Sequence, residues 1–141
     1  MYEQRTQRSM EAMSRKDLGA MMRPFADDAV FEMAGHTSLS GRYEGKAAIE
    51  GLFRRIFERV ETIRFTVKHV ALTNPIGFTY NNTIFVESEV DETSTDGVTI
   101  HDKRIAVYEY RRGKLVSVRE WAFDPTVVEA IWSHVEAPVA A

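Results

Sequence analysis

Residues 99–123, TIHDKRIAVYEYRRGKLVSVREWAF, decide the fold. Two runs rich in β-branched and aromatic residues, Thr99–Tyr110 and Lys114–Phe123, flank Arg111–Gly113. We predict that these three residues form a hairpin loop, a type I turn followed by glycine in the left-handed region, so that Tyr110 faces Lys114. Counting back along both strands, Glu120 faces Arg104 and Ala122 faces Asp102.

This register places one acid, one base and a second acid on a single strand face, because strand side chains alternate with a period of two. Their neighbours Val118 and Ala106 are apolar. Burial is expected to raise the pKa of Glu120 and the cation of Arg104 to lower it, which suits a carboxyl that gives and takes protons. Glu120 is therefore the candidate catalytic acid or base, tuned by Arg104 and assisted by Asp102. The alternative is a buried ion pair that only fixes strand register.

The opposite face of the hairpin also carries apolar side chains, among them Leu115, Trp121 and Ile105. Both faces therefore need cover. With the faces reversed, His101 and Arg119 would enter the pocket and Glu120 would leave it, so His101 is kept as a candidate binding residue.

The composition is that of one soluble globular domain, which we place at residues 1–141 with its core at about 5–135. A net charge of −3 and a pI near 5.8 argue against a nucleic-acid partner. The chain has no cysteine, which excludes disulfides and is consistent with a reducing compartment. No apolar run resembles a signal peptide or a membrane span, so we expect a cytoplasmic protein without a membrane partner.

Periodicity along the chain predicts helices first and strands later. Helical spacing covers residues 2–13, a second helix that Ser14 caps near Arg15 and that Pro24 ends, and residues 46–60. Alternation predicts a short strand within 25–33 and long strands at 64–72 and 78–91, with loops at 35–45 and 92–97. Asp124 and Pro125 open a final helix ending near His134. This order is typical of an α+β domain with helices on one face of a sheet.

Further pocket candidates come from the loops and from the strand at 78–91. His36 and Tyr43 lie in the polar loop and are candidates for the pocket mouth. The strand has a more apolar face with Tyr80 and a more acidic face with Asp91, and either face is a candidate for the interior. The four histidines show no paired spacing, so we expect neither a metal nor another cofactor.

Three segments resemble SnoaL-like proteins of the nuclear transport factor 2-like superfamily: PFADDAVFEM at 24–33, GRYEGKAAIEGLF at 41–53 and YEYRRGKLVSVREWAFD at 108–124. The resemblance implies a cone-shaped, curved mixed or antiparallel sheet wrapped around N-terminal helices, also called a cystatin-like α+β barrel. It further implies a hydrophobic pocket inside the cone and a homodimer through the outer sheet face. Members include ketosteroid isomerases, polyketide cyclases, limonene-epoxide-hydrolase-like enzymes, phenazine-biosynthesis proteins and proteins without catalysis.

The resemblance places the pocket carboxylate of several of these families at Glu120. It places the aspartate of the epoxide hydrolases at Asp91, with Glu89 where those enzymes have arginine. The isomerase general base falls at Met33, which has no titratable proton and is kept as a binding residue. The water-holding tyrosine of the epoxide hydrolases falls at Phe31, and a phenazine-protein histidine falls near Leu52.

Two functions follow as hypotheses. The first is a small enzyme without a cofactor that binds an apolar, ring-containing metabolite and performs isomerisation, cyclisation or epoxide opening. Its catalytic residues would be Glu120, Arg104, Asp102 and Asp91, and its binding residues Tyr80, His36, Tyr43, His101 and Met33. The second is a protein of the same fold that binds a ligand or serves as a scaffold without turnover.

Overall fold

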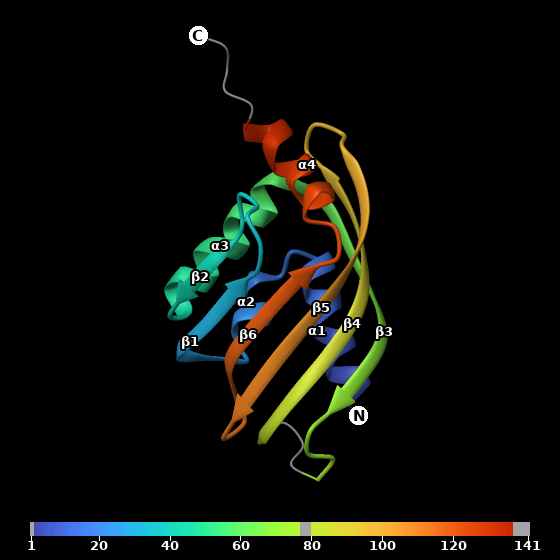
Figure 1. Cartoon of the computed structure of the whole chain (residues 1–141). Coiled ribbons are helices and arrows are strands. Elements are labelled where there is room, and N and C mark those ends of the chain that lie inside the picture. Colours follow the sequence, from blue (N-terminus) through green and yellow to red (C-terminus); the bar gives the residue numbers. More distant parts are fainter. Residues whose placement is uncertain (1, 77–79, 137–141) are drawn as a thin grey trace.

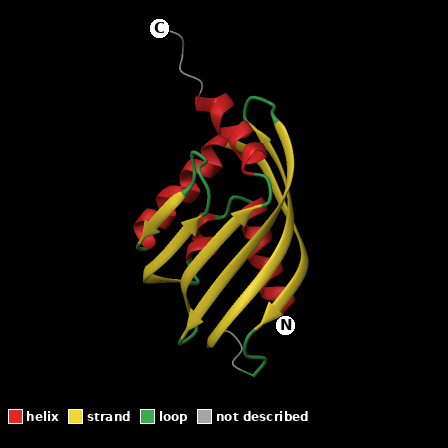
Figure 2. Cartoon of the chain, viewed as in Figure 1, coloured by secondary structure: helices red, strands yellow, loops and turns green. Residues whose placement is uncertain are grey.

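The chain folds into a curved six-stranded sheet with helices gathered on its concave side (Figures 1 and 2). The structure, a computed structural model, describes residues 2–76 and 80–136. Its helices are α1 (Tyr2–Ser14), α2 (Leu18–Met22), α3 (Lys46–Arg59) and α4 (Pro125–Glu136). Its strands are β1 (Phe25–Met33), β2 (Gly41–Glu44), β3 (Val60–Leu72), β4 (Asn81–Ser94), β5 (Thr99–Arg111) and β6 (Lys114–Ala122).

The sheet is mixed, with the spatial order β2-β1-β6-β5-β4-β3. β1 runs parallel to β6, and the other neighbours are antiparallel. Helix α1 packs against β3, α3 against β1, and α4 against β5 (Figure 1). The expected curved α+β architecture is therefore confirmed.

Several predicted boundaries were wrong. The predicted loop 35–45 contains β2, whose Arg42 side chain binds Glu32 and Glu44 at 2.6 and 2.7 Å and ties the short strand to β1. Asp17, rather than Ser14, caps α2 by accepting a hydrogen bond from the Ala20 amide. β3 begins at residue 60 instead of 64, directly at the end of α3.

β4 also differs from its prediction. It extends through residues 92–94, which were expected to form a loop, and its predicted first residue, Phe78, lies outside the described residues. Its even-numbered side chains face inward, and the extension therefore adds Glu92 and Ser94 to the buried face. Of the two candidate faces, the more apolar one is the inner face.

The register of the β5–β6 hairpin differs from the predicted one by two residues. Arg112 and Gly113 have φ values of 51° and 78°, which mark a two-residue type I′ turn in place of the predicted three-residue loop. A bulge follows, because Tyr110 pairs with Leu115 and Glu109 with Ser117, so that Val116 has no partner across the ladder.

As a result Glu120 faces Ala106, and Ala122 faces Arg104. The predicted pairing of Glu120 with Arg104 was wrong, but a shift of two leaves every later side chain on its predicted face. The exception is Leu115, which precedes the bulge and is buried inside rather than lying beside Trp121 outside.

The core fills the concave side between α3, α4 and the sheet. Its most fully buried large side chains are Trp132, Ile49, Leu52 and Ile131. Burying a side chain of this size contributes roughly 1.5–3 kcal/mol. No helix in the described ranges is long and apolar enough to cross a membrane.

Candidate functional site

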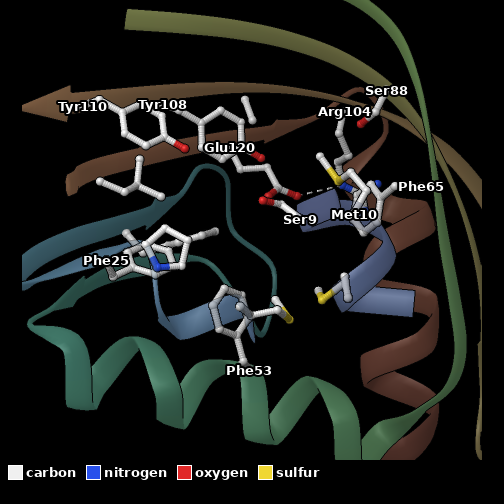
Figure 3. A pocket seen from close by; sticks show the side chains of 16 residues that line it. Ser9, Met10, Phe25, Phe53, Phe65, Ser88, Arg104, Tyr108, Tyr110 and Glu120 are labelled. Atoms are coloured by element: carbon white, nitrogen blue, oxygen red, sulfur yellow. Dashed lines mark ion pairs between the residues drawn. The ribbon is translucent and has the colours of Figure 1, made fainter. Parts of the chain in front are cut away.

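A partly open cavity of about 90 Å³ lies between the concave face of the sheet and helices α1 to α3 (Figure 3). Most of its wall is apolar, with three methionines and a set of aromatic rings. The aromatic lining residues are Phe25, Phe31, Phe53, Phe65, Tyr108 and Tyr110. Glu120, Arg104, Ser9 and Ser88 supply the polar groups. A mostly apolar cavity with a few convergent polar groups is the usual form of a small-molecule site.

Glu120 projects from β6 into this cavity, with 16% of its side chain exposed (Figure 3). Its Oε1 lies 3.5 Å from Nε of Arg104, which comes from the neighbouring strand β5. Burial raises the pKa of the Glu120 carboxyl, and the positive charge of Arg104 only partly opposes the rise. The protonated form of Glu120 is therefore favoured more than that of an exposed glutamate.

Arg104 binds three carboxyl groups at once. Its guanidinium nitrogens lie 3.0 Å from Asp102, 3.5 Å from Glu120 and 3.8 Å from Glu92. The side chains of Arg104, Asp102 and Glu92 are each less than 10% exposed. One cation cannot neutralise three buried anions, so the cluster favours binding at least one proton.

Glu92 is a member of this cluster that the sequence did not single out. Burial raises the pKa of its carboxyl to about 7, Arg104 opposes the rise, and the nearby Glu120 and Asp102 add to it. Glu92 also lines a second cavity of about 40 Å³, beside Trp132 and Val128. Glu120 and Arg104 line both cavities and therefore stand between them.

Tyr108 is the second group that sequence reasoning missed. Its ring comes from β5, two residues along the same face from Ala106, and lines the larger cavity next to Glu120 (Figure 3). Burial and the charge of Glu120 raise the pKa of its hydroxyl, which therefore stays protonated. The hydroxyl lines the cavity beside Glu120, where it can donate a hydrogen bond to a ligand.

Asp102 is held by hydrogen bonds within the fold and does not face either cavity. It accepts a hydrogen bond from Arg104 and another, at 3.2 Å, from the backbone amide of Asp124 at the start of α4. It lines neither cavity. The structure therefore brings it to Arg104 but not to the place where a ligand would lie.

The structure does not bring Asp91 and His101 to the cavity. They lie on the outer face of β4 and β5, where the Asp91 carboxylate is 2.8 Å from Nδ1 of His101 and both side chains are 55% exposed. The assignment of Asp91 to the pocket was wrong because β4 keeps a regular alternation with its even residues inside. His101 would point into the cavity only if the two faces of the hairpin were exchanged.

The remaining predicted binding residues lie around the fold. Tyr80 is 61% exposed, and His36 is exposed in the loop before β2. Tyr43 is half-buried and donates its hydroxyl hydrogen to the Leu39 carbonyl at 2.7 Å. Met33 lines the second cavity. Only Met33 in this set lies beside the Arg104 cluster.

No set of three or more histidine and acidic side chains in the described parts of the chain is arranged to hold a metal ion. The acids are instead gathered around Arg104.

Comparisons with known proteins agree with this architecture. A family model described as a SnoaL-like domain matches residues 6–118. A nuclear transport factor 2-like protein of unknown function from Burkholderia pseudomallei is 18% identical, with a TM-score of 0.76 over 92% of this chain and 95% of that one. No curated protein sequence matches the chain significantly.

Two further solved structures are similar in fold. A protein from Bacillus subtilis, provisionally described as an isomerase, is 25% identical, with a TM-score of 0.74 over 91% of this chain and 89% of that one. TerC, co-crystallised with polyporic acid, is 16% identical, with a TM-score of 0.70 over 87% of this chain and 91% of that one.

Proposed function

Because the chain belongs to the SnoaL-like domain family and encloses a buried carboxyl in an apolar cavity, we propose that it is a small enzyme performing acid–base chemistry without a cofactor. Its substrate is an apolar, ring-containing metabolite, and the reaction is an isomerisation, a cyclisation or an epoxide opening. The position of Glu120, inside the cavity and beside Arg104, is the observation that carries this proposal.

Each polar group has a role in such a reaction. Burial favours the protonated form of Glu120, and in that form it gives its proton to a developing oxygen anion. In its ionised form, stabilised by Arg104, the same carboxylate takes a proton from a carbon acid. The Tyr108 hydroxyl, which stays protonated, donates a hydrogen bond to the same oxygen. Arg104 keeps the Glu120 side chain in place and stabilises its anion after proton transfer.

The cavity volume limits how a ring binds. About 90 Å³ is less than the ~150 Å³ of an engineered cavity known to take up benzene. A ring therefore enters when the side chains of Met10, Met13 and Met21 move, and methionine is the apolar side chain that adapts most readily. TerC, with its bound polyporic acid, supports an organic ligand for this fold.

The proposal is tested by incubating the protein in D₂O with a panel of cyclic ketones and epoxides and following deuterium uptake and product mass. Glu120→Gln is expected to lower the rate by about 10²-fold or more, the usual contribution of a general acid or base. Asp91→Asn, which changes an acid on the opposite sheet face, is the matched control and should leave the rate unchanged. Equal rates for Glu120→Gln and the original protein would remove Glu120 from the mechanism.

A second candidate function is ligand binding without turnover. This function is favoured by apolar residues at the positions where, by the family resemblance, catalytic members have polar side chains. Phe31 and Met33 line the cavities with side chains that carry no titratable proton, and Leu52 is buried in the core. A ligand recovered bound and unaltered from the deuterium experiment would support this function.

We further propose that a second copy of the chain covers the outer sheet face. Phe85 lies opposite Val107, and Ile105 lies opposite Trp121. Phe85, Ile105 and Trp121 therefore form an apolar patch across β4, β5 and β6 around Val107, which is itself buried. Phe85 and Trp121 are 42% and 40% exposed. A patch of this kind is typical of a protein interface. Light scattering at several concentrations tests the expected homodimer.

A further inference from the structure

We propose that, among ring-containing metabolites, the cavity selects those carrying a compact protonated amine, an alkylammonium group whose positive charge completes the charge balance around Arg104. This inference deepens the proposed function by naming the substrate class, and it depends on that function only in using the same cavity as the ligand site.

The first support is an imbalance of charge. Three carboxyl groups, Glu92, Asp102 and Glu120, lie within 4 Å of the Arg104 guanidinium. Among the described residues that line the two cavities, Arg104 is the only lysine or arginine. An incoming cation gains attraction from the surplus acids in a low-dielectric interior, whereas an incoming carboxylate meets repulsion and adds a buried anion.

The second support is the aromatic wall opposite the acids. The Phe25, Phe31 and Phe53 rings form one cluster, with centroid distances of 5.6–6.5 Å, and Phe53 lies across the cavity from Glu120 (Figure 3). Tyr108 and Tyr110 stand on the Glu120 side. Aromatic rings around a pocket attract alkylammonium ions through their electron-rich faces while burying the alkyl groups. Neither the surplus of acids nor the electron-rich ring faces would favour a bound anion.

The third support is size. A cavity of about 90 Å³ suits a compact group of a few heavy atoms without any movement of the wall. A tertiary-butyl or trimethylammonium group is of this size. A larger substrate would place such a group beside Glu120 and extend toward the methionines.

Binding of a cation is linked to pH through the carboxyls. The groups that face them are Arg104 and Asp102 from β5, the Tyr108 and Tyr110 hydroxyls from the same strand, Glu92 from β4 and Glu120 from β6. Because burial raises the pKa of Glu92 to about 7 and also raises that of Glu120, these acids hold protons at lower pH. A cation favours their ionised forms, so its binding releases a proton and its affinity rises with pH through this range.

Three probes of nearly the same shape test the inference: tert-butylammonium, tert-butanol and pivalate. Their binding to the full chain is measured by ligand-observed NMR and calorimetry at a pH of about 6 and about 8.5, where an aliphatic amine stays protonated. The expected result is that tert-butylammonium binds at least about tenfold more tightly than tert-butanol at the higher pH. Pivalate should bind most weakly, and the preference for the cation should shrink at the lower pH.

Variants locate the preference. Glu120→Gln should lower the affinity for tert-butylammonium about tenfold or more and change that for tert-butanol by less than about twofold. Asp91→Asn should change neither. Comparing the isosteres on the unmodified chain keeps the test valid if Glu120→Gln fails to fold.

The outcomes separate the two proposals. Equal or tighter binding of tert-butanol, tight binding of pivalate, or no binding of any probe would each overturn the amine preference. Acid–base turnover that depends on Glu120 would stand in all of these cases, because it is measured with other compounds in the deuterium experiment.

Discussion

Acidic side chains on the two faces of the sheet differ in how they are paired with cations and in how far they are exposed to water. On the outer face of β4, Glu87, Glu89 and Asp91 each have their own basic neighbour. These neighbours are His69 at 2.9 Å, Lys68 at 3.4 Å and His101 at 2.8 Å. On the inner face Glu92 shares Arg104 with two further acids. The outer acids are partly exposed, whereas Arg104, Asp102 and Glu92 are almost fully buried.

Burial, rather than residue type, therefore makes the inner acids of this chain candidates for chemistry. Water screens the outer pairs, which contribute about 0–1 kcal/mol each. The inner acids are shielded from water and share a single cation, so the free energy of unfolding depends on whether they are protonated. Four variants test this difference, in order of decreasing effect.

The largest effect is expected when the buried cation is removed. Arg104→Met leaves three acids without a counter-charge and should lower the free energy of unfolding by about 3–5 kcal/mol at pH 7. Without Arg104, burial raises the pKa values of Glu92 and Glu120 in the folded state further, so the loss should shrink as the pH falls and these acids protonate. Urea unfolding across pH measures both. The neighbouring Lys103→Met, on the exposed face, should stay within about 0.5 kcal/mol, and similar losses for the two variants would contradict the comparison.

The next effect concerns the inner acid of β4. The pKa of Glu92 is raised from 4.5 to about 7, so the folded state binds a proton more tightly than the unfolded state and stability falls as the pH rises between these values. A shift of this size corresponds to at most about 3 kcal/mol. Glu92→Gln should flatten this part of the stability–pH curve. An unchanged slope, measured by thermal or urea unfolding at several pH values, would show that Glu92 does not titrate there.

A third prediction concerns the outer apolar patch. Trp121→Ser should weaken association of the proposed homodimer by about 2 kcal/mol, the cost typical of a central aromatic residue in an interface. The internal cavity lies on the other face, so binding of tert-butanol by the monomer should persist. Sedimentation equilibrium measures the association. A dimer of unchanged strength would place the interface elsewhere.

The smallest effect is expected for an outer ion pair. Asp91→Asn should change the free energy of unfolding by no more than about 0.5 kcal/mol at low salt, and added salt should reduce the difference further, because exposed pairs are screened. Parallel urea titrations with and without salt measure this. A loss comparable to that of Arg104→Met would remove the distinction between the two faces.

Much of the fold was predictable because its signals are local. Helical spacing in 46–60 and alternation along 99–123 depend only on neighbouring residues, and they located α3 and the final hairpin within a few residues. The family resemblance added the curvature of the sheet. β2 was missed because its four residues begin with Gly41 and are followed by Gly45, and its strand form depends on pairing with β1.

The site was predictable in part. The period of two placed Glu120 and Arg104 on one face, and the family resemblance indicated that this face is the inner one. Glu92 was missed because Thr93 to Gly97 has the composition of a loop, although Ile84, Val86, Ser88 and Val90 continue into it without a break in alternation. The distances within the cluster depend on side chains reaching across strands, which no spacing rule encodes.

The bulge at Val116 has a consequence for how such a domain gains or loses activity. If Val116 paired with Glu109 in a regular ladder, Glu120 would lie opposite Ile105 and point to the outer patch. One extra residue just after the turn therefore determines which face of the sheet each later side chain of β6 occupies. In proteins built this way, a change of hairpin length can convert an interior acid into an interface residue without altering the acid itself.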